Sequence, residues 1–215
     1  MSFVNKEFSI PMDSKKFTAV LTIPPRAKSV ILFAHGGGGG RHAPRNNLIA
    51  RYLNKNNIGT LLFDMLTKQE DRSNKNNLNI PLLSKRLLAA TKWFKKQPEA
   101  NGMKIGYFAV SSGTAAALQA ASNLPKDIFA IVSKSGRPDL AMYSLGILKA
   151  PILFIVGEED EVIVELNEQA FVNLPGKKEM VIVPNAGHFF DEPGTSNEAA
   201  KLTVAWFKKH LKNKK

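Results

Sequence analysis

The sequence predicts an α/β protein with a mostly parallel central sheet, helices on both faces of that sheet, and an antiparallel hairpin at the N-terminal end. Short continuous apolar runs recur along the chain, with the length typical of strands that are buried on both faces. Stretches with helical spacing of apolar residues alternate with these runs, and that alternation is typical of a parallel sheet covered by helices. Only the first part of the chain shows apolar and polar residues in strict alternation.

The elements follow from these patterns in order. Two alternating runs, residues 3–10 and 17–23, are joined by a turn at residues 11–14 and predict the hairpin. Six apolar runs then predict buried strands at residues 30–34, 60–63, 105–109, 128–132, 152–156 and 180–183. The clearest helix covers residues 81–97, because its apolar side chains recur every three or four residues. Its other face is predicted to be solvated and carries Lys85, Arg86, Lys92 and Lys95.

Length and composition predict a single domain that spans residues 1–215. Of the 215 residues 44% are hydrophobic, which is enough for a sizeable core, and no composition break indicates a second domain. The chain has no cysteine, so disulfides, thiolate metal ligands and a cysteine nucleophile are excluded. No apolar run approaches the roughly 18 residues of a membrane-spanning helix, and the charged N-terminus is not typical of a signal peptide. We therefore expect a cytoplasmic protein without a membrane partner.

The net charge of +12 is concentrated at the C-terminal end, where the last fifteen residues hold six lysines and no acidic residue. These lysines alternate with apolar residues such as Trp206 and Phe207, which predicts a C-terminal helix with a solvated basic face. His210 is expected to be solvated among them. Arginines do not alternate with aromatic residues as base stacking would require, so we expect no nucleic-acid partner.

A candidate nucleophile lies where the apolar run 105–109 passes through two serines into an alanine-rich helix. A serine on such a sharp turn is strained and exposes its hydroxyl, provided that small residues flank it. Ser111 has Ala109 and Gly113 two residues away on either side, whereas bulkier β-branched residues flank Ser112. Ser111 is therefore the better nucleophile. The alternative is that both serines only cap the following helix.

A base and an acid follow two further strands. His188 comes just after the run 180–183, and Asp160 just after the run 152–156. The carboxyl ends of parallel strands meet at one edge of a sheet, and the order Ser111, Asp160, His188 is that of nucleophile, acid and base in hydrolases of this architecture. The neighbouring glutamates at 158, 159 and 161 are alternative acids, and an acidic turn can also be a simple solvated loop.

A run of glycines, residues 36–40, follows the apolar run 30–34 and suits an oxyanion hole, where backbone N–H groups must approach the substrate closely. The N–H groups of Gly37 and Ser112 are the predicted donors. A phosphate-binding loop is disfavoured because Arg41 and His42 follow the glycines where Lys-Ser or Lys-Thr is needed. His35 is expected to anchor the loop. Residues that could bind an anionic substrate, or simply lie on the surface, are His35, Arg41, His42, Arg45 and Arg137.

Taken together, these motifs resemble the α/β-hydrolase superfamily, and among its members the small dienelactone-hydrolase-like serine hydrolases. The resemblance rests on the segments 35–46, 60–64, 109–113, 135–139, 156–160 and 187–194. It implies an α/β-hydrolase fold without a cap domain and a catalytic triad of Ser111, Asp160 and His188. Dienelactone hydrolases themselves use a cysteine nucleophile, so activity on dienelactone is not expected. Ala109 also replaces the usual glycine of the nucleophile turn.

The expected function is hydrolysis of small carboxylic esters, thioesters or lactones through an acyl-enzyme on Ser111. No metal and no organic cofactor is expected, and the partner is a small ester-like substrate, with a homo-oligomer left open. Two alternatives remain at this point. The same triad could serve an acyltransferase or a peptidase, or the fold could be a catalytically silent module that binds an acidic partner through its basic end.

Overall fold

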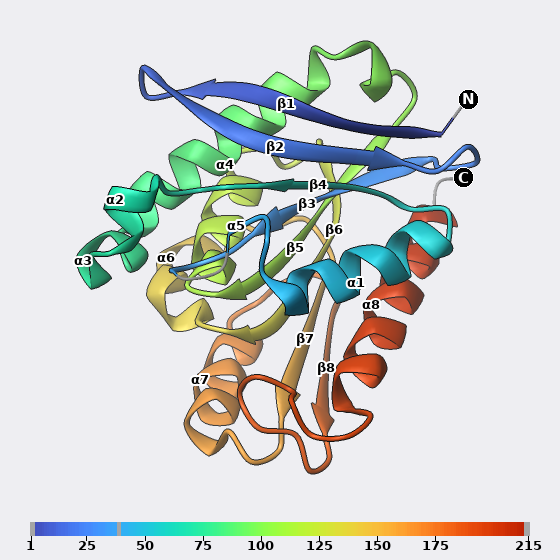
Figure 1. Cartoon of the computed structure of the whole chain (residues 1–215). Helices are drawn as coiled ribbons and strands as arrows, with labels where there is room; N and C mark the ends of the chain where they lie inside the picture. Colours follow the sequence, from blue (N-terminus) through green and yellow to red (C-terminus); the bar gives the residue numbers. More distant parts are fainter. Residues whose placement is uncertain (1–2, 38–39, 213–215) are drawn as a thin grey trace.

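The computed structural model describes residues 3–37 and 40–212, which form an eight-stranded sheet in the order β1-β2-β4-β3-β5-β6-β7-β8 (Figure 1). β1 (Val4–Met12) and β2 (Lys15–Ile23) form an antiparallel hairpin, and β2 runs antiparallel to β4 (Gly59–Phe63). All later pairings are parallel. The other strands are β3 (Ser29–Ala34), β5 (Lys104–Ser111), β6 (Ile128–Gly136), β7 (Ile152–Gly157) and β8 (Lys178–Val183). The predicted fold class is confirmed.

Helices cover both faces of the sheet. On one face α1 (Pro44–Lys55) packs beside α8 (Thr195–Lys212), as Figure 1 shows, and their apolar side chains meet Phe33 and Phe108 of the sheet. On the other face lie α4 (Ile80–Lys95), α5 (Gly113–Ser122) and α7 (Glu161–Val172). The two faces therefore enclose two apolar clusters, one on each side of the sheet.

Several short elements lie in the connections between the main strands and helices. α2 (Lys68–Asp71) and α3 (Asn74–Asn77) follow β4, and α6 (Met142–Leu145) follows β6. Two single 3₁₀ turns, Pro98–Ala100 and Pro138–Ala141, lie before β5 and before α6. Within the described ranges no insertion between strands forms a cap domain. None of the helices there is long and apolar enough to cross a membrane.

The structure corrects several boundaries. β6 continues four residues past the predicted end, through Lys134, because its neighbours β5 and β7 also extend there. The hairpin turn is tighter than predicted, since Asp13 and Ser14 alone make it, both with positive φ. β8 is an edge strand, so Ile182 is exposed although the run was predicted to be buried on both faces.

Two side chains predicted to be solvated are buried. His210 is only 7% exposed, because it stands one helical turn after Trp206 and packs on that ring at 4.2 Å between centroids. Arg86, predicted on the solvated face of α4, is 2% exposed. Its guanidinium extends over the ring of Phe17 toward carboxylates on other elements, described below.

Candidate active site

The turn between β5 and α5 holds Ser111 in a strained conformation. Its φ is +51°, a value that non-glycine residues rarely adopt, while Ser112 next to it has an ordinary helical conformation. The strain is maintained by close packing behind the turn, where a Cβ added to Gly113 would lie 2.3 Å from the carbonyl oxygen of Ala34. The backbone carbonyl of Ser111 also accepts a hydrogen bond from the N–H of Arg137. These contacts keep the Ser111 hydroxyl at the carboxyl edge of the sheet.

His188 and Asp160 meet at the same edge. Nδ1 of His188 lies 2.6 Å from Oδ2 of Asp160, and the hydroxyl of Ser135 donates a hydrogen bond to the backbone carbonyl of His188. The loop of His188 is also bonded to the loop after β7, since Glu159 donates its backbone N–H to the carbonyl of Ala186. A carboxylate that accepts from Nδ1 leaves Nε2 of the imidazole free to take a proton.

Ser111 and His188 line one cavity of about 190 Å³. Within the described ranges the Ser111 hydroxyl makes no hydrogen bond, so the candidate nucleophile and the imidazole line the same cavity without being bonded to each other. Bonds of this kind often form only when substrate is present. The other lining residues include His35, Gly36, Gly37, Val110, Lys134 and Phe189.

The predicted oxyanion loop is anchored by His35. Its Nδ1–H donates to the carbonyl of Gly36 at 2.6 Å, and its Nε2 accepts the backbone N–H of Met65 at 3.2 Å. A nearby contact of Nε2 with the carbonyl of Phe63 cannot be a second hydrogen bond in this tautomer. Gly36 packs against Ser112, and a side chain on Gly37 would collide with Asn77. The predicted glycines 38 and 39 lie outside the described residues.

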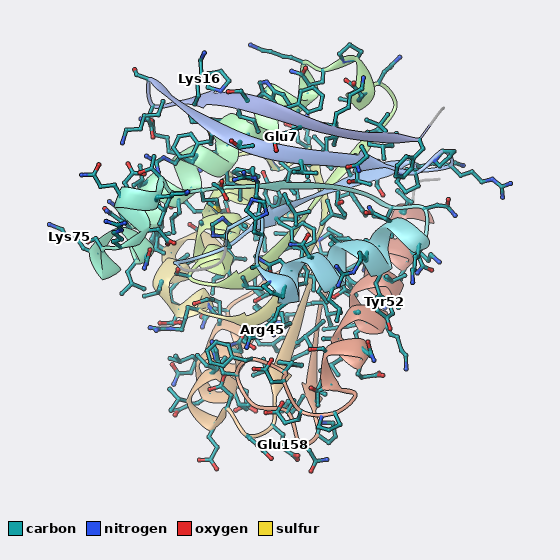
Figure 2. All side chains as sticks on the ribbon, viewed as in Figure 1. Glu7, Lys16, Arg45, Tyr52, Lys75 and Glu158 are labelled. Atoms are coloured by element: carbon teal, nitrogen blue, oxygen red, sulfur yellow. The ribbon has the colours of Figure 1, made fainter. Side chains whose placement is uncertain are left out.

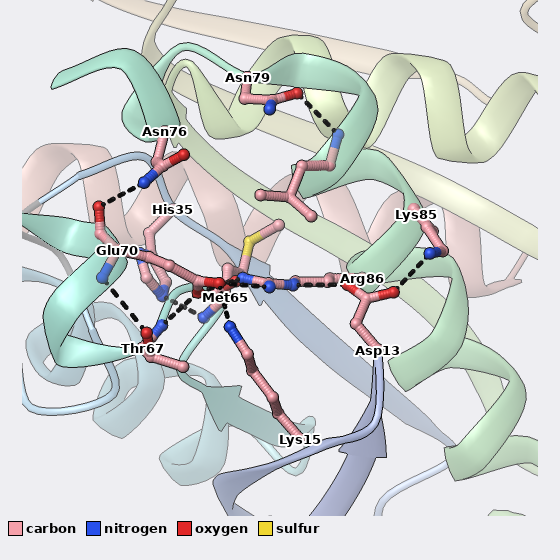
Figure 3. Close-up of polar contacts among 11 residues, drawn as sticks. Asp13, Lys15, His35, Met65, Thr67, Glu70, Asn76, Asn79, Lys85 and Arg86 are labelled. Carbon is pink, nitrogen blue, oxygen red and sulfur yellow. Dashed lines mark hydrogen bonds and ion pairs between the residues drawn. The ribbon is translucent and has the colours of Figure 1, made fainter. Parts of the chain in front are cut away.

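Behind His35 lies a buried ion-pair network, drawn in Figure 3. Arg86 donates to Glu70 through two nitrogens, to Asp13 and to the carbonyl of Met65, all at 2.8–3.0 Å. Lys15 adds a further bond to Glu70. Because Met65 is bonded to both Arg86 and His35, the network supports the loop that carries Gly36.

The arginines predicted near the substrate are paired with carboxylates. Arg41 is bonded to Asp64, and Arg137 is bonded to Asp139 through two nitrogens. The cavity that Ser111 lines is not lined by Arg41, Arg137 or His42. Arg45, labelled in Figure 2 at the start of α1, does line the cavity, but its guanidinium is bonded to Asp191.

Sequence reasoning missed Lys134 and the two aromatic residues after His188. Lys134 lines the cavity with Ser111, and Phe190 lies beneath its amine. The ring of Phe189 packs edge-on to the imidazole of His188. The signal in the sequence was a lysine two residues after the apolar run 128–132, toward the carboxyl end of a parallel strand.

Comparisons with known proteins agree with this fold. The crystal structure of a dienelactone hydrolase from Anabaena variabilis is 39% identical, with a TM-score of 0.92, covering 97% of this chain and 98% of that one. A cold-adapted esterase from an Arctic intertidal metagenomic library shares the fold at a TM-score of 0.78 and 16% identity, covering 99% of this chain and 100% of that one.

Two Mycobacterium tuberculosis proteins that carry provisional names as phosphoribosyl transferases are 45% identical over 191 residues, which is 89% of this chain. The chain spans only 43% of the length of these relatives. The sequence profile of the dienelactone hydrolase family matches residues 17–212. This match covers nearly the whole described chain, and the chain therefore belongs to the dienelactone hydrolase family, with the α/β-hydrolase fold.

Proposed function

We propose that this protein is a serine hydrolase that cleaves small carboxylic esters, thioesters or lactones through an acyl-enzyme on Ser111. The observation that carries the proposal is the shared cavity, which is lined by a strained serine and by an imidazole whose Nδ1 is bonded to Asp160. A serine hydroxyl is a weak nucleophile until a base takes its proton, and this arrangement supplies the base together with the carboxylate that orients it.

The proposed reaction assigns a role to each of these residues. Nε2 of His188 takes the proton as the oxygen of Ser111 attacks the carbonyl carbon, and Asp160 stabilises the imidazolium that forms. The N–H groups of Gly37 and Ser112 hold the developing oxyanion, each contributing roughly 3 kcal/mol to lowering the barrier. His188 then returns the proton to the leaving group. Water, activated by the same imidazole, hydrolyses the acyl-enzyme.

The substrate class is limited by the size of the cavity. A volume of about 190 Å³ without a cap domain suits small acyl groups or the exposed ends of larger molecules. The dienelactone hydrolase that is 39% identical to this chain supports hydrolysis of an ester-like bond. No observation in this chain favours phosphoribosyl transfer, the activity in the names of the mycobacterial proteins, of which the chain spans less than half.

The test is labelling with a fluorophosphonate probe, which reacts only with an activated serine. Ser111→Ala should abolish labelling and lower turnover of short-chain p-nitrophenyl esters by a factor on the order of 10⁴ or more. Ser9→Ala, which removes an exposed hydroxyl from β1, is the matched control and should be labelled like the natural protein. Retained turnover in the Ser111→Ala variant overturns the proposal.

A further inference from the structure

Lys134 places a primary amine in the candidate active site. It lies near the end of β6, in register with Val110 of β5 and Ile155 of β7, so it is the lateral neighbour of the residue that precedes Ser111. Its side chain is 7% exposed and lines the same cavity as Ser111 and His188. Most of the residue is therefore covered by protein, although it borders the cavity.

This amine has no carboxylate partner within residues 3–37 and 40–212. The contact at its end is the face of the Phe190 ring, 4.0 Å from Nζ to the centroid. The nearby arginines differ in this respect, because Arg45 is bonded to Asp191 and Arg137 to Asp139. A buried ammonium without an ion pair is costly, and the neutral amine avoids that cost.

The surrounding charges act on the amine from several elements. Burial is the main cause that lowers the pKa of Lys134, to about 8, and the charge of Arg45 on α1 lowers it further. Asp191 and Glu192 before α8, and Asp160 before α7, act in the opposite direction, and the imidazole of His188 lines the same cavity. At pH 7 about a tenth of such amines are neutral, against about 0.04% for an ordinary lysine with a pKa near 10.4.

We propose that Lys134 is a second nucleophile in this cavity and forms a Schiff base with small aldehydes and ketones. The lone pair of Nζ attacks the carbonyl carbon, and the carbonyl oxygen takes up a proton to give a carbinolamine. Loss of water then forms the C=N bond, so the imine and one water molecule are the only products. A lysine desolvated in an apolar site beside another cation is the usual setting for this chemistry.

The cavity suits such a ligand. Its volume of about 190 Å³ admits a molecule of a few heavy atoms, and Gly36 and Gly37 are among the residues that line it. Phe190, fully buried beneath the amine, provides an apolar floor that restricts water and so slows hydrolysis of the imine. The proposal shares the cavity with the proposed hydrolase but needs neither the Ser111 hydroxyl nor the triad.

The experiment is reductive trapping on the whole chain. The protein is treated with butanal and sodium cyanoborohydride at pH 7, and the modified lysines are mapped by peptide mass spectrometry. Lys134 should be modified at least about tenfold faster than the exposed Lys92, because of its larger neutral fraction. The rate at Lys134 should rise with pH and level off above about 8. Modification spread evenly over the lysines overturns the proposal.

Two variants separate this proposal from the hydrolase. Ser111→Ala should still be trapped at Lys134, whereas it loses fluorophosphonate labelling. In the natural protein, trapping should block fluorophosphonate labelling of Ser111, because the butyl group fills the shared cavity. In Lys134→Arg the same treatment should leave fluorophosphonate labelling as it was before treatment. If trapping blocks labelling equally in Lys134→Arg, another lysine is responsible and the proposal fails.

Discussion

At the scale of single residues, the candidate site depends on one short hydrogen bond. Asp160 holds the imidazole of His188 through Nδ1 at 2.6 Å, and its side chain is only 16% exposed. The adjacent Glu159 is exposed and its side chain makes no such bond within the described chain. Two neighbouring acidic residues therefore have different surroundings, which are set by the local turn after β7.

Asp160→Asn should separate orientation from charge. An amide cannot stabilise the imidazolium and presents an N–H group to Nδ1, which reverses the tautomer, so kcat for short-chain esters should fall by about 10³ to 10⁴. The measurement is steady-state kinetics with p-nitrophenyl esters. Glu159→Gln is the matched control and should stay close to the natural rate. A kcat for Asp160→Asn within tenfold of the natural value contradicts this role.

At the scale of elements, the hairpin, α2 and α4 are joined by the buried guanidinium of Arg86. Asp13 comes from the hairpin turn and Glu70 from α2, while Arg86 stands on α4. The contact continues through Met65 to His35, so elements far from the cavity help to hold the glycine loop. The hydrogen bonds from Arg86 are the main reason that the pKa of Glu70 lies far below its usual range.

Arg86→Met should destabilise the protein by about 3–5 kcal/mol, because two partly buried carboxylates lose their common partner. The measurement is urea denaturation monitored by circular dichroism. Lys85→Met, which removes the exposed lysine that also pairs with Asp13, is the control and should cost less than about 1 kcal/mol. Equal losses in the two variants would show that burial of the pair is unimportant.

The contact between Arg86 and Glu70 also predicts how the stability of the protein depends on pH. The pKa of Glu70 is lower in the folded protein than its ordinary value of 4.5, so the folded state holds fewer protons. The stabilisation is therefore fully present above pH 4.5 and is lost progressively as the pH falls toward the lowered value. In Arg86→Met this decline should be shallower, which the same denaturation series at decreasing pH would show.

At the scale of the whole molecule, the site forms where loops from separate strands approach within contact distance. The loop after β8 crosses the end of β7 so closely that a Cβ on Gly157 would lie 2.2 Å from the carbonyl oxygen of Ala186 and 2.6 Å from that of Gly187. These carbonyls belong to the two residues that precede His188. Gly157, at the end of the neighbouring strand β7, therefore lets the loop that carries the imidazole come this close because it has no side chain.

Gly157→Ala should displace the loop of His188. We expect a loss of about 1–3 kcal/mol in stability from overpacking and a clear loss of kcat with short-chain esters. Thermal denaturation and steady-state kinetics measure the two effects. Gly146→Ala is the matched control, because nothing lies within 4 Å of its added Cβ. If both variants behave alike, the close approach does not position the imidazole.

The sequence alone determined the alternation of strands and helices, because periodicity is a local property that neighbouring residues carry. It also singled out Ser111, Asp160 and His188, since each lies within five residues after an apolar run and all such ends meet at one edge of a parallel sheet. Edge strands were misjudged, because an apolar run does not say whether a strand has neighbours on both sides, as β8 shows.

Only the tertiary structure decided which charges are neutralised. Arg86 looked solvated in the sequence and is buried, and Arg41 and Arg137 looked available and are bonded to carboxylates. Lys134 drew no attention in the sequence and is the cation that lines the cavity without a carboxylate partner among the described residues. The physical reason is that ion pairs and burial depend on long-range contacts, such as the one between Arg86 and Asp13, which no local pattern encodes.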